Sequence, residues 1–114
     1  MDLACHQRLF LYIVISVKKL FSWNAANVRH IAKHGVKVDE AEYVVRNAGR
    51  GFPRKIGNGK WIVKSSAADG RSLQVIFIYP ADDEIDVDSL SVPDLIDYSE
   101  GNGKVVYVIH AMPI

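Results

Sequence analysis

The sequence predicts an α+β fold in which two N-terminal helices pack on an antiparallel β-meander. Segments 23–34 and 38–48 have the apolar spacing of helices. Segments 60–65, 72–79 and 104–111 are rich in β-branched and aromatic residues, as strands are. Because the helices precede the strands instead of alternating with them, an α+β arrangement is favoured over an α/β one.

The first helical segment has one apolar and one polar side. Its apolar stripe is expected at Val28, Ile31 and Ala32. Asn24 is expected to cap its start, and Gly35 to end it. The polar side then carries Asn27, His30, Lys33 and His34. The second helical segment is expected to bury Ala41, Val44, Val45 and Ala48.

Turn signals connect the strands. Asp69-Gly70 predicts a hairpin between the first two strands, and Gly101-Asn102-Gly103 leads into the last one. An unusually long acidic connection, at about 80–103, lies between the second and the third predicted strand. We expect it to be a solvated or disordered loop.

Residues 1–19 are interpreted as an N-terminal extension or an extra strand, and residues 20–114 as a single domain. Segment 10–17 is β-branched and aromatic, which leaves both alternatives open. We expect the extension to be dispensable, with an alternative start near Val17.

The apolar run that ends at Val17 is too short for the roughly 20 residues of a membrane span, so no membrane association is expected. Cys5 is the only cysteine, which excludes an internal disulfide and favours the cytoplasm.

The charges are divided unevenly along the chain. Residues 1–72 hold 13 Lys and Arg against five Asp and Glu, whereas residues 73–114 hold one against eight. The net charge of +1 therefore conceals a basic and an acidic part. Such a chain could present a basic face to a polyanion or pair its two parts internally, and the sequence leaves both open.

Several blocks of residues resemble a known family. They are Phe21-Ser22-Trp23-Asn24, His30-Ile31-Ala32-Lys33-His34-Gly35-Val36, Asp69-Gly70-Arg71-Ser72-Leu73-Gln74-Val75 and Val106-Tyr107-Val108-Ile109-His110-Ala111. In order and content they resemble BrnT-like toxins, over about 20–114 without the acidic insertion.

This resemblance implies a fold of the RelE/ParE toxin type. It also implies the toxin component of a bacterial type II toxin–antitoxin pair, a metal-independent ribonuclease that inhibits translation. The implied partners are RNA and a cognate antitoxin protein, and a homo-oligomer held through the toxin–antitoxin complex is left open. Ser65-Ser66 and Met112 stand where the family tends to have arginine. The alternative is therefore a catalytically silent binding protein of the same fold.

Five residues are candidates for the catalytic site. Imidazoles titrate near neutral pH and can transfer protons, while lysine and arginine can stabilise phosphate charge. The candidates are His30, Lys33, His34, Arg71 and His110. The alternatives are that the two helical histidines only cap and pack the helix end, that Arg71 only pairs across the sheet with a carboxylate, and that His110 is a core or interface residue.

A second set of basic residues is a candidate RNA-binding track, with a solvated surface as the alternative. It consists of Arg46, Arg50, Arg54, Lys55, Lys60 and Lys64. Strand parity places Lys60 and Lys64 on one face, and Trp61 and Val63 toward the core.

No metal or other cofactor is expected. His30 and His34 stand four residues apart and could ligate zinc, but the glutamate of a His-Glu-x-x-His motif is missing between them.

Overall fold

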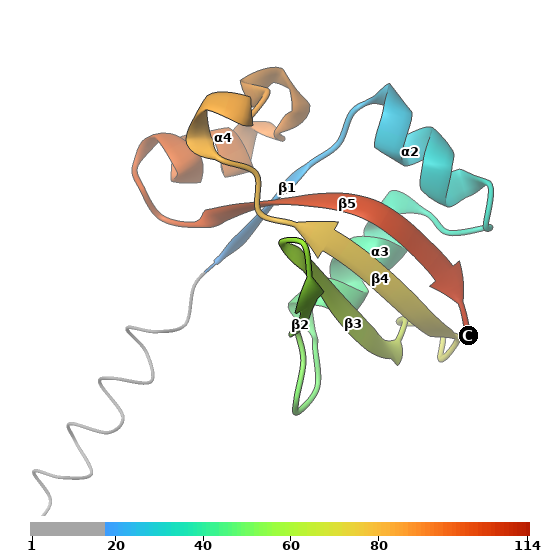
Figure 1. Ribbon diagram of the computed structural model, residues 1–114. Helices are drawn as coiled ribbons and strands as arrows, with labels where there is room; N and C mark the ends of the chain where they lie inside the picture. Colours follow the sequence, from blue (N-terminus) through green and yellow to red (C-terminus); the bar gives the residue numbers. More distant parts are fainter. Residues whose placement is uncertain (1–17) are drawn as a thin grey trace, which may run out of the picture.

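Residues 18–114 are described by a computed structural model of the chain, and they form an α+β fold (Figure 1). The strands are β1 (Lys19–Ser22), β2 (Arg54–Gly57), β3 (Lys60–Ser66), β4 (Ser72–Ile78) and β5 (Lys104–Pro113). The helices are α2 (Ala25–Ala32), α3 (Val38–Arg46) and α4 (Val92–Ser99), with short 3-10 helices η1 (Asp82–Glu84) and η2 (Val87–Ser89). The expectations for segment 10–17 and for Cys5 lie outside the described residues.

The sheet is mixed, with the strand order β1-β5-β4-β3-β2. The predicted strands β3, β4 and β5 pair antiparallel in sequence order, as expected. The strand β2, which was not predicted, pairs antiparallel with β3. However, β1 pairs parallel with β5, from Lys19 opposite Lys104 to Ser22 opposite Tyr107. The prediction of a purely antiparallel meander is therefore wrong. The strand β1 is only four residues long, too short to give a recognisable alternating pattern in the sequence.

The start of α2 is confirmed, but its predicted apolar stripe is wrong. Asn24 is the N-cap, and Gly35 follows the helix with a φ of 73°. The helix buries Asn27 and Ile31, whereas Val28 is 38% exposed. Asn27 is buried because its amide bonds the backbone on both sides of the cap: Nδ2 donates to the Ser22 carbonyl, and Oδ1 accepts from the Asn24 N–H.

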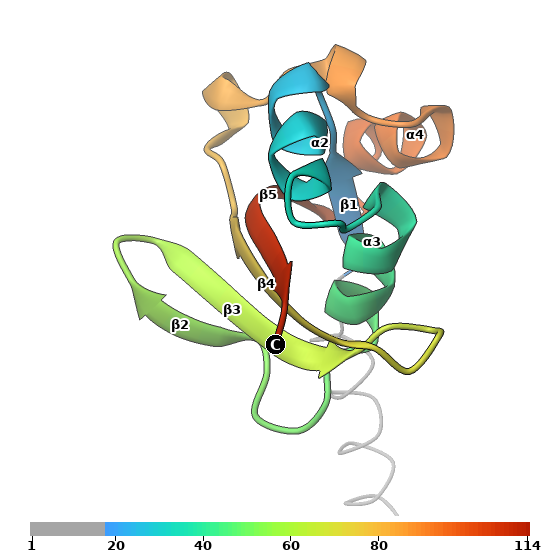
Figure 2. The ribbon, with the colours of Figure 1, turned by 90° about the vertical axis from the view of Figure 1, so that its right-hand side faces the viewer.

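The main core lies between α3 and the sheet. As predicted, α3 buries Ala41, Val44 and Val45. Trp61 and Val63 of β3 face this core, which also contains Phe21, Ile31, Phe77 and Val108. α3 contacts β3 and β4, while α2 contacts β5 (Figure 2). No helix of residues 18–114 is long and apolar enough to cross a lipid bilayer.

The acidic connection is folded, contrary to the expected loop. It contains η1, η2 and α4, and it forms a second apolar cluster in which Leu90 packs with Leu20 of β1 and Val105 of β5. The carboxylate of Asp94 accepts a hydrogen bond from the Phe21 N–H, and Asp97 forms an ion pair with Lys18. The prediction failed because the many acidic residues concealed the few apolar positions that hold this segment against β1.

The junction between β1 and β5 is tightly packed at Gly103. A Cβ added there would lie 2.8 Å from the Leu20 Cγ and 2.9 Å from the Lys18 carbonyl oxygen. We expect Gly103→Ala to lower the free energy of unfolding by about 1–3 kcal/mol, the usual cost of overpacking. Urea denaturation measures this change. Gly49→Ala is the matched control because a Cβ there meets no atom within 4 Å, and an equal loss in both variants would contradict the prediction.

Candidate histidine site

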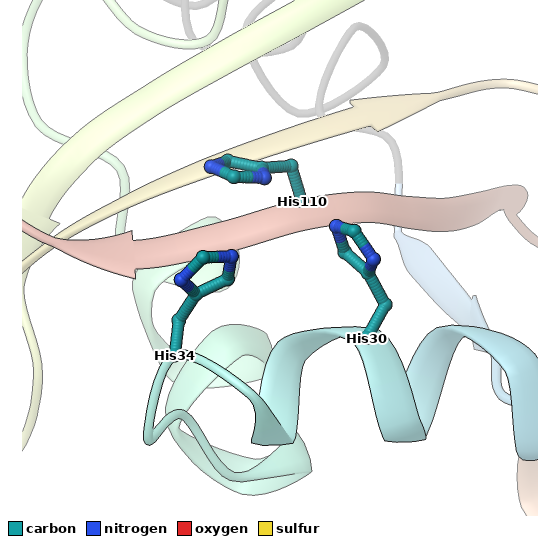
Figure 3. Close-up of side chains that lie close together, drawn as sticks. All are labelled: His30, His34 and His110. Carbon is teal, nitrogen blue, oxygen red and sulfur yellow. The ribbon is translucent and has the colours of Figure 1, made fainter.

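Three histidines from separate parts of the chain meet at one place. The ring centroids are 5.9 Å apart for His30 and His34, 5.7 Å for His30 and His110, and 5.1 Å for His34 and His110. Figure 3 shows the ring of His30 extending from α2, and that of His34 from the turn after it, toward β5, where they meet the ring of His110. We call these residues the histidine cluster. Of the five predicted catalytic residues, the fold therefore brings these three together.

The backbone around α2 fixes two members of the cluster. His30 lies in the last turn of α2, and His34 lies in the turn that closes the helix. The N–H of His34 donates to the Ile31 carbonyl at 3.0 Å, and the N–H of Val36 donates to the same carbonyl at 3.1 Å. Residues four positions apart on a helix share one face, so both imidazoles extend to the same side.

A β-bulge in β5 places the third member. Phe77 is paired with Val108, and Ile76 with His110, so that Ile109 has no partner on β4. The extra residue lets both Val108 and Ala111 reach the core, while His110 lies on the opposite face of the sheet. Bulges commonly redirect a side chain in this way.

The environment of His110 within the cluster favours its neutral ring. His30 and His34 are exposed and His110 is partly buried. Burial lowers the pKa of His110, and the positive charges that His34 and then His30 carry when protonated lower this pKa further. Within residues 18–114, none of the three rings has a carboxylate or another hydrogen-bonding partner.

Lys33 and Arg71, the other two predicted catalytic residues, differ in whether a carboxylate compensates their charge. Lys33 is exposed at the C-cap of α2. The Nη2 of Arg71 donates to both carboxylate oxygens of Glu40, at 2.8 and 2.9 Å, and to the Gly35 carbonyl at 3.1 Å. Arg71 therefore ties the start of β4 to α3, and a carboxylate compensates its charge. This carboxylate lies on a helix, whereas the alternative interpretation expected one across the sheet.

The predicted RNA-binding residues do not form one track. Arg46 is on α3, where it pairs with Glu42 and lies over the Phe21 ring. Arg54 lies over the Phe52 ring beside β2. The exposed residues Arg50, Lys55, Lys60 and Lys64 are in the α3–β2 connection, β2 and β3.

The face of the sheet opposite the core connects part of this set to the histidine cluster. Arg54, Ile62, Ile76 and His110 are directly paired from β2 to β5 and form one row across four strands. With neighbouring strands about 4.8 Å apart, this row is about 14 Å long. Lys60 and Lys64 share this face, since each is two residues from Ile62 on β3. We call it the open sheet face; the sequence could not identify it without the register of the strands.

The two main surface pockets of the described residues lie elsewhere. One, of about 360 Å³, is lined by Lys37, Asp39, Glu40, Tyr43, Ala68 and Asp69. The other, of about 240 Å³, is lined by Ser22, Asn24, Ile78, Pro80, Glu84, Ile85, Asp86 and Tyr107. Neither is lined by a histidine, and two of the three clustered histidines are exposed.

Comparison of the chain with protein-family models, curated proteins and solved structures finds no match.

The Arg71–Glu40 contact is expected to stabilise the fold. A double-mutant cycle with Arg71→Ala and Glu40→Ala should give a coupling energy of about 1 kcal/mol, at the upper end for a partly exposed pair. The Arg46–Glu42 pair is the control, and a cycle there should give about 0.5 kcal/mol, as for an i,i+4 pair on a helix. Denaturant unfolding measures both, and a coupling near zero for Arg71 and Glu40 would contradict this role.

The pKa of His110 should depend on its neighbours. In metal-free protein, His34→Gln should raise this pKa toward its ordinary value by removing one positive charge, while burial keeps it lowered. NMR titration of the ring measures the change, with His6→Gln as the control. His110 binds its proton more weakly in the folded protein than in the unfolded chain. The free energy of unfolding should therefore decrease as the pH falls below about 6.5. An unchanged or lower pKa in His34→Gln would contradict the assignment.

Proposed function

We propose that the protein is a metal-independent ribonuclease, the toxin component of a bacterial type II toxin–antitoxin pair that inhibits translation. One observation carries the proposal: three imidazoles from α2, its closing turn and β5 converge on one exposed place. The resemblance of residues 20–114 to BrnT-like toxins supports the same function, because the matching blocks contain all three histidines.

Such a cluster suits RNA cleavage by transesterification. The ribose 2′-oxygen forms a bond to the adjacent phosphorus, and the bond from phosphorus to the 5′-oxygen breaks. A neutral imidazole accepts the proton of the 2′-hydroxyl, and a protonated imidazole donates a proton to the departing 5′-oxygen. The products are a 2′,3′-cyclic phosphate and a 5′-hydroxyl. The ring separations of 5.1 to 5.9 Å are compatible with an acid and a base that act on a single phosphate.

The open sheet face offers RNA a path to the cluster. The strands β2 to β5 contain no Asp or Glu, so Arg54, Lys60 and Lys64 are not opposed by acidic residues of these strands. A phosphate backbone bound by these cations would reach the histidine cluster along the row through Ile62 and Ile76. Trp61 faces the core and packs against Tyr79, which argues against a base-stacking role.

Lys33 is the cation that we assign to the transition state. It is exposed and lies between two members of the cluster in sequence, and a positive charge there would stabilise the developing negative charge on phosphate. We assign to Arg71 the role of holding the start of β4 against α3, because Glu40 already compensates its charge.

The proposal includes a partner and a location. The order of two helices before an antiparallel β2–β5 sheet is compatible with a RelE/ParE-like arrangement. A toxin of this kind is expected in the bacterial cytoplasm, bound to a cognate antitoxin protein, with a homo-oligomer formed through that complex.

One observation favours the alternative of a catalytically silent binding protein. Arg71 is engaged by Glu40, and Ser66 and Met112 stand where the family tends to have arginine. The protein would then present fewer free cations to a reacting phosphate than a typical toxin.

Incubation with RNA tests the proposal. In the presence of EDTA, the wild-type protein should cleave a mixed-sequence RNA and leave 2′,3′-cyclic phosphate ends. His30→Ala and His110→Gln should each lower the rate about 100-fold or more, the usual contribution of general acid–base catalysis. His6→Ala is the control and should cleave normally. Circular dichroism verifies that all variants are folded.

Intact RNA with the folded wild-type protein would overturn the ribonuclease and favour the silent binding protein. Cleavage that persists in both cluster variants would place the active site elsewhere.

A further inference from the structure

We propose that His30, His34 and His110 form a binding site for one divalent transition-metal ion of the zinc class. This inference goes beyond the proposed function and does not depend on it, because metal binding is measurable without RNA. It rests on the positions of three ligand atoms and on the chemistry of imidazole.

The ligand atoms are already close together. One ring nitrogen from each histidine lies within 4.8 Å of the other two. In a tetrahedral zinc site with Zn–N bonds of about 2.0–2.1 Å, ligand nitrogens are about 3.4 Å apart. The widest separation must therefore close by at most about 1.4 Å. This is an adjustment of the size that rotation about χ1 and χ2 of an imidazole side chain provides.

The three ligands come from two separately supported segments of the backbone. The closing turn of α2, with its hydrogen bonds to the Ile31 carbonyl, holds His30 and His34 one turn apart. The ladder between β4 and β5 holds His110, and the bulge at Ile109 directs it to this side of the sheet. Binding of the ion would thus connect α2 to β5 across a contact that already exists, at little cost in chain entropy.

The donor set selects the class of metal. Three neutral imidazoles suit zinc, nickel and copper, whereas magnesium, calcium and manganese prefer oxygen ligands. Among residues 18–114, the groups that approach within this distance include no carboxylate. The lowered pKa of His110 is compatible with this role, since a metal ligand must be deprotonated.

The surroundings leave room for a fourth ligand. His30 and His34 are exposed, so the side of the cluster away from the sheet faces solvent. A site with three protein ligands and one open position normally completes its tetrahedron with water. The ion would therefore be exchangeable and accessible to an external ligand, unlike a closed structural zinc site.

A direct binding measurement tests the proposal. The full chain, purified without a polyhistidine tag and freed of metal, is titrated with Co²⁺ as a spectroscopic probe and then with Zn²⁺ in competition. We expect one ion per chain, with Co²⁺ absorption bands of tetrahedral intensity that Zn²⁺ abolishes. The melting temperature should rise on addition of Zn²⁺, because the ion binds only the folded site.

Variants assign the ligands. His30→Ala, His34→Ala and His110→Gln should each lower the Zn²⁺ affinity at least tenfold. His6→Ala changes the remaining histidine, which lies outside the described residues, and should leave the affinity unchanged. Because His30 and His34 are exposed, their variants are expected to stay folded even if His110→Gln does not.

Two results would overturn the proposal: no stoichiometric binding by the wild-type chain, or binding that His6→Ala abolishes and His30→Ala retains. Neither result bears on RNA cleavage, which is tested in EDTA. Conversely, failure to cleave RNA leaves the metal site standing.

Discussion

The parallel pairing of β1 with the first half of β5 is the contact on which the candidate site depends. It covers only Lys104 to Tyr107, so the edge of β5 beyond these residues is left for α2. Asn27 fixes the connection between β1 and α2, because its buried amide forms hydrogen bonds with the end of β1 and with the cap of α2. The helix is thereby held beside the second half of β5, where its two histidines meet His110.

The acidic part of the chain supports the same contact from the other side. Its apolar cluster packs Leu90 against Leu20 and Val105, and Asp94 bonds the Phe21 N–H. Lys18 and Asp97 connect the basic and acidic parts of the sequence through an ion pair. Of the two alternatives for the divided charge, internal pairing is therefore observed at one ion pair, while a basic face for a polyanion stays a prediction. One acidic residue pairs internally with the basic part, while strands β2 to β5 carry basic residues and no acidic ones.

The histidine cluster and the open sheet face both depend on the β-bulge at Ile109 of β5. The bulge at Ile109 lets the apolar residues on both sides of it reach the core, and His110 then shares the open face with Ile76 and Ile62. Without the extra residue, strand alternation would place Val108 away from Phe77. The proposed proton transfer and the proposed metal site use the same imidazole lone pairs, so an ion bound there would exclude proton transfer by its ligands.

The sequence by itself determined the local elements: the capped start of α2, the buried face of α3, and the hairpin at Asp69-Gly70. These depend on spacing and turn chemistry within a few residues. Only the tertiary structure decided that β1 joins the sheet parallel, that 80–103 packs on it, and that Arg71 pairs with Glu40. It also decided that His110 meets two histidines about 80 residues earlier in the chain. Strand register and a single unpaired residue set that contact, and neither leaves a periodic signal in the sequence.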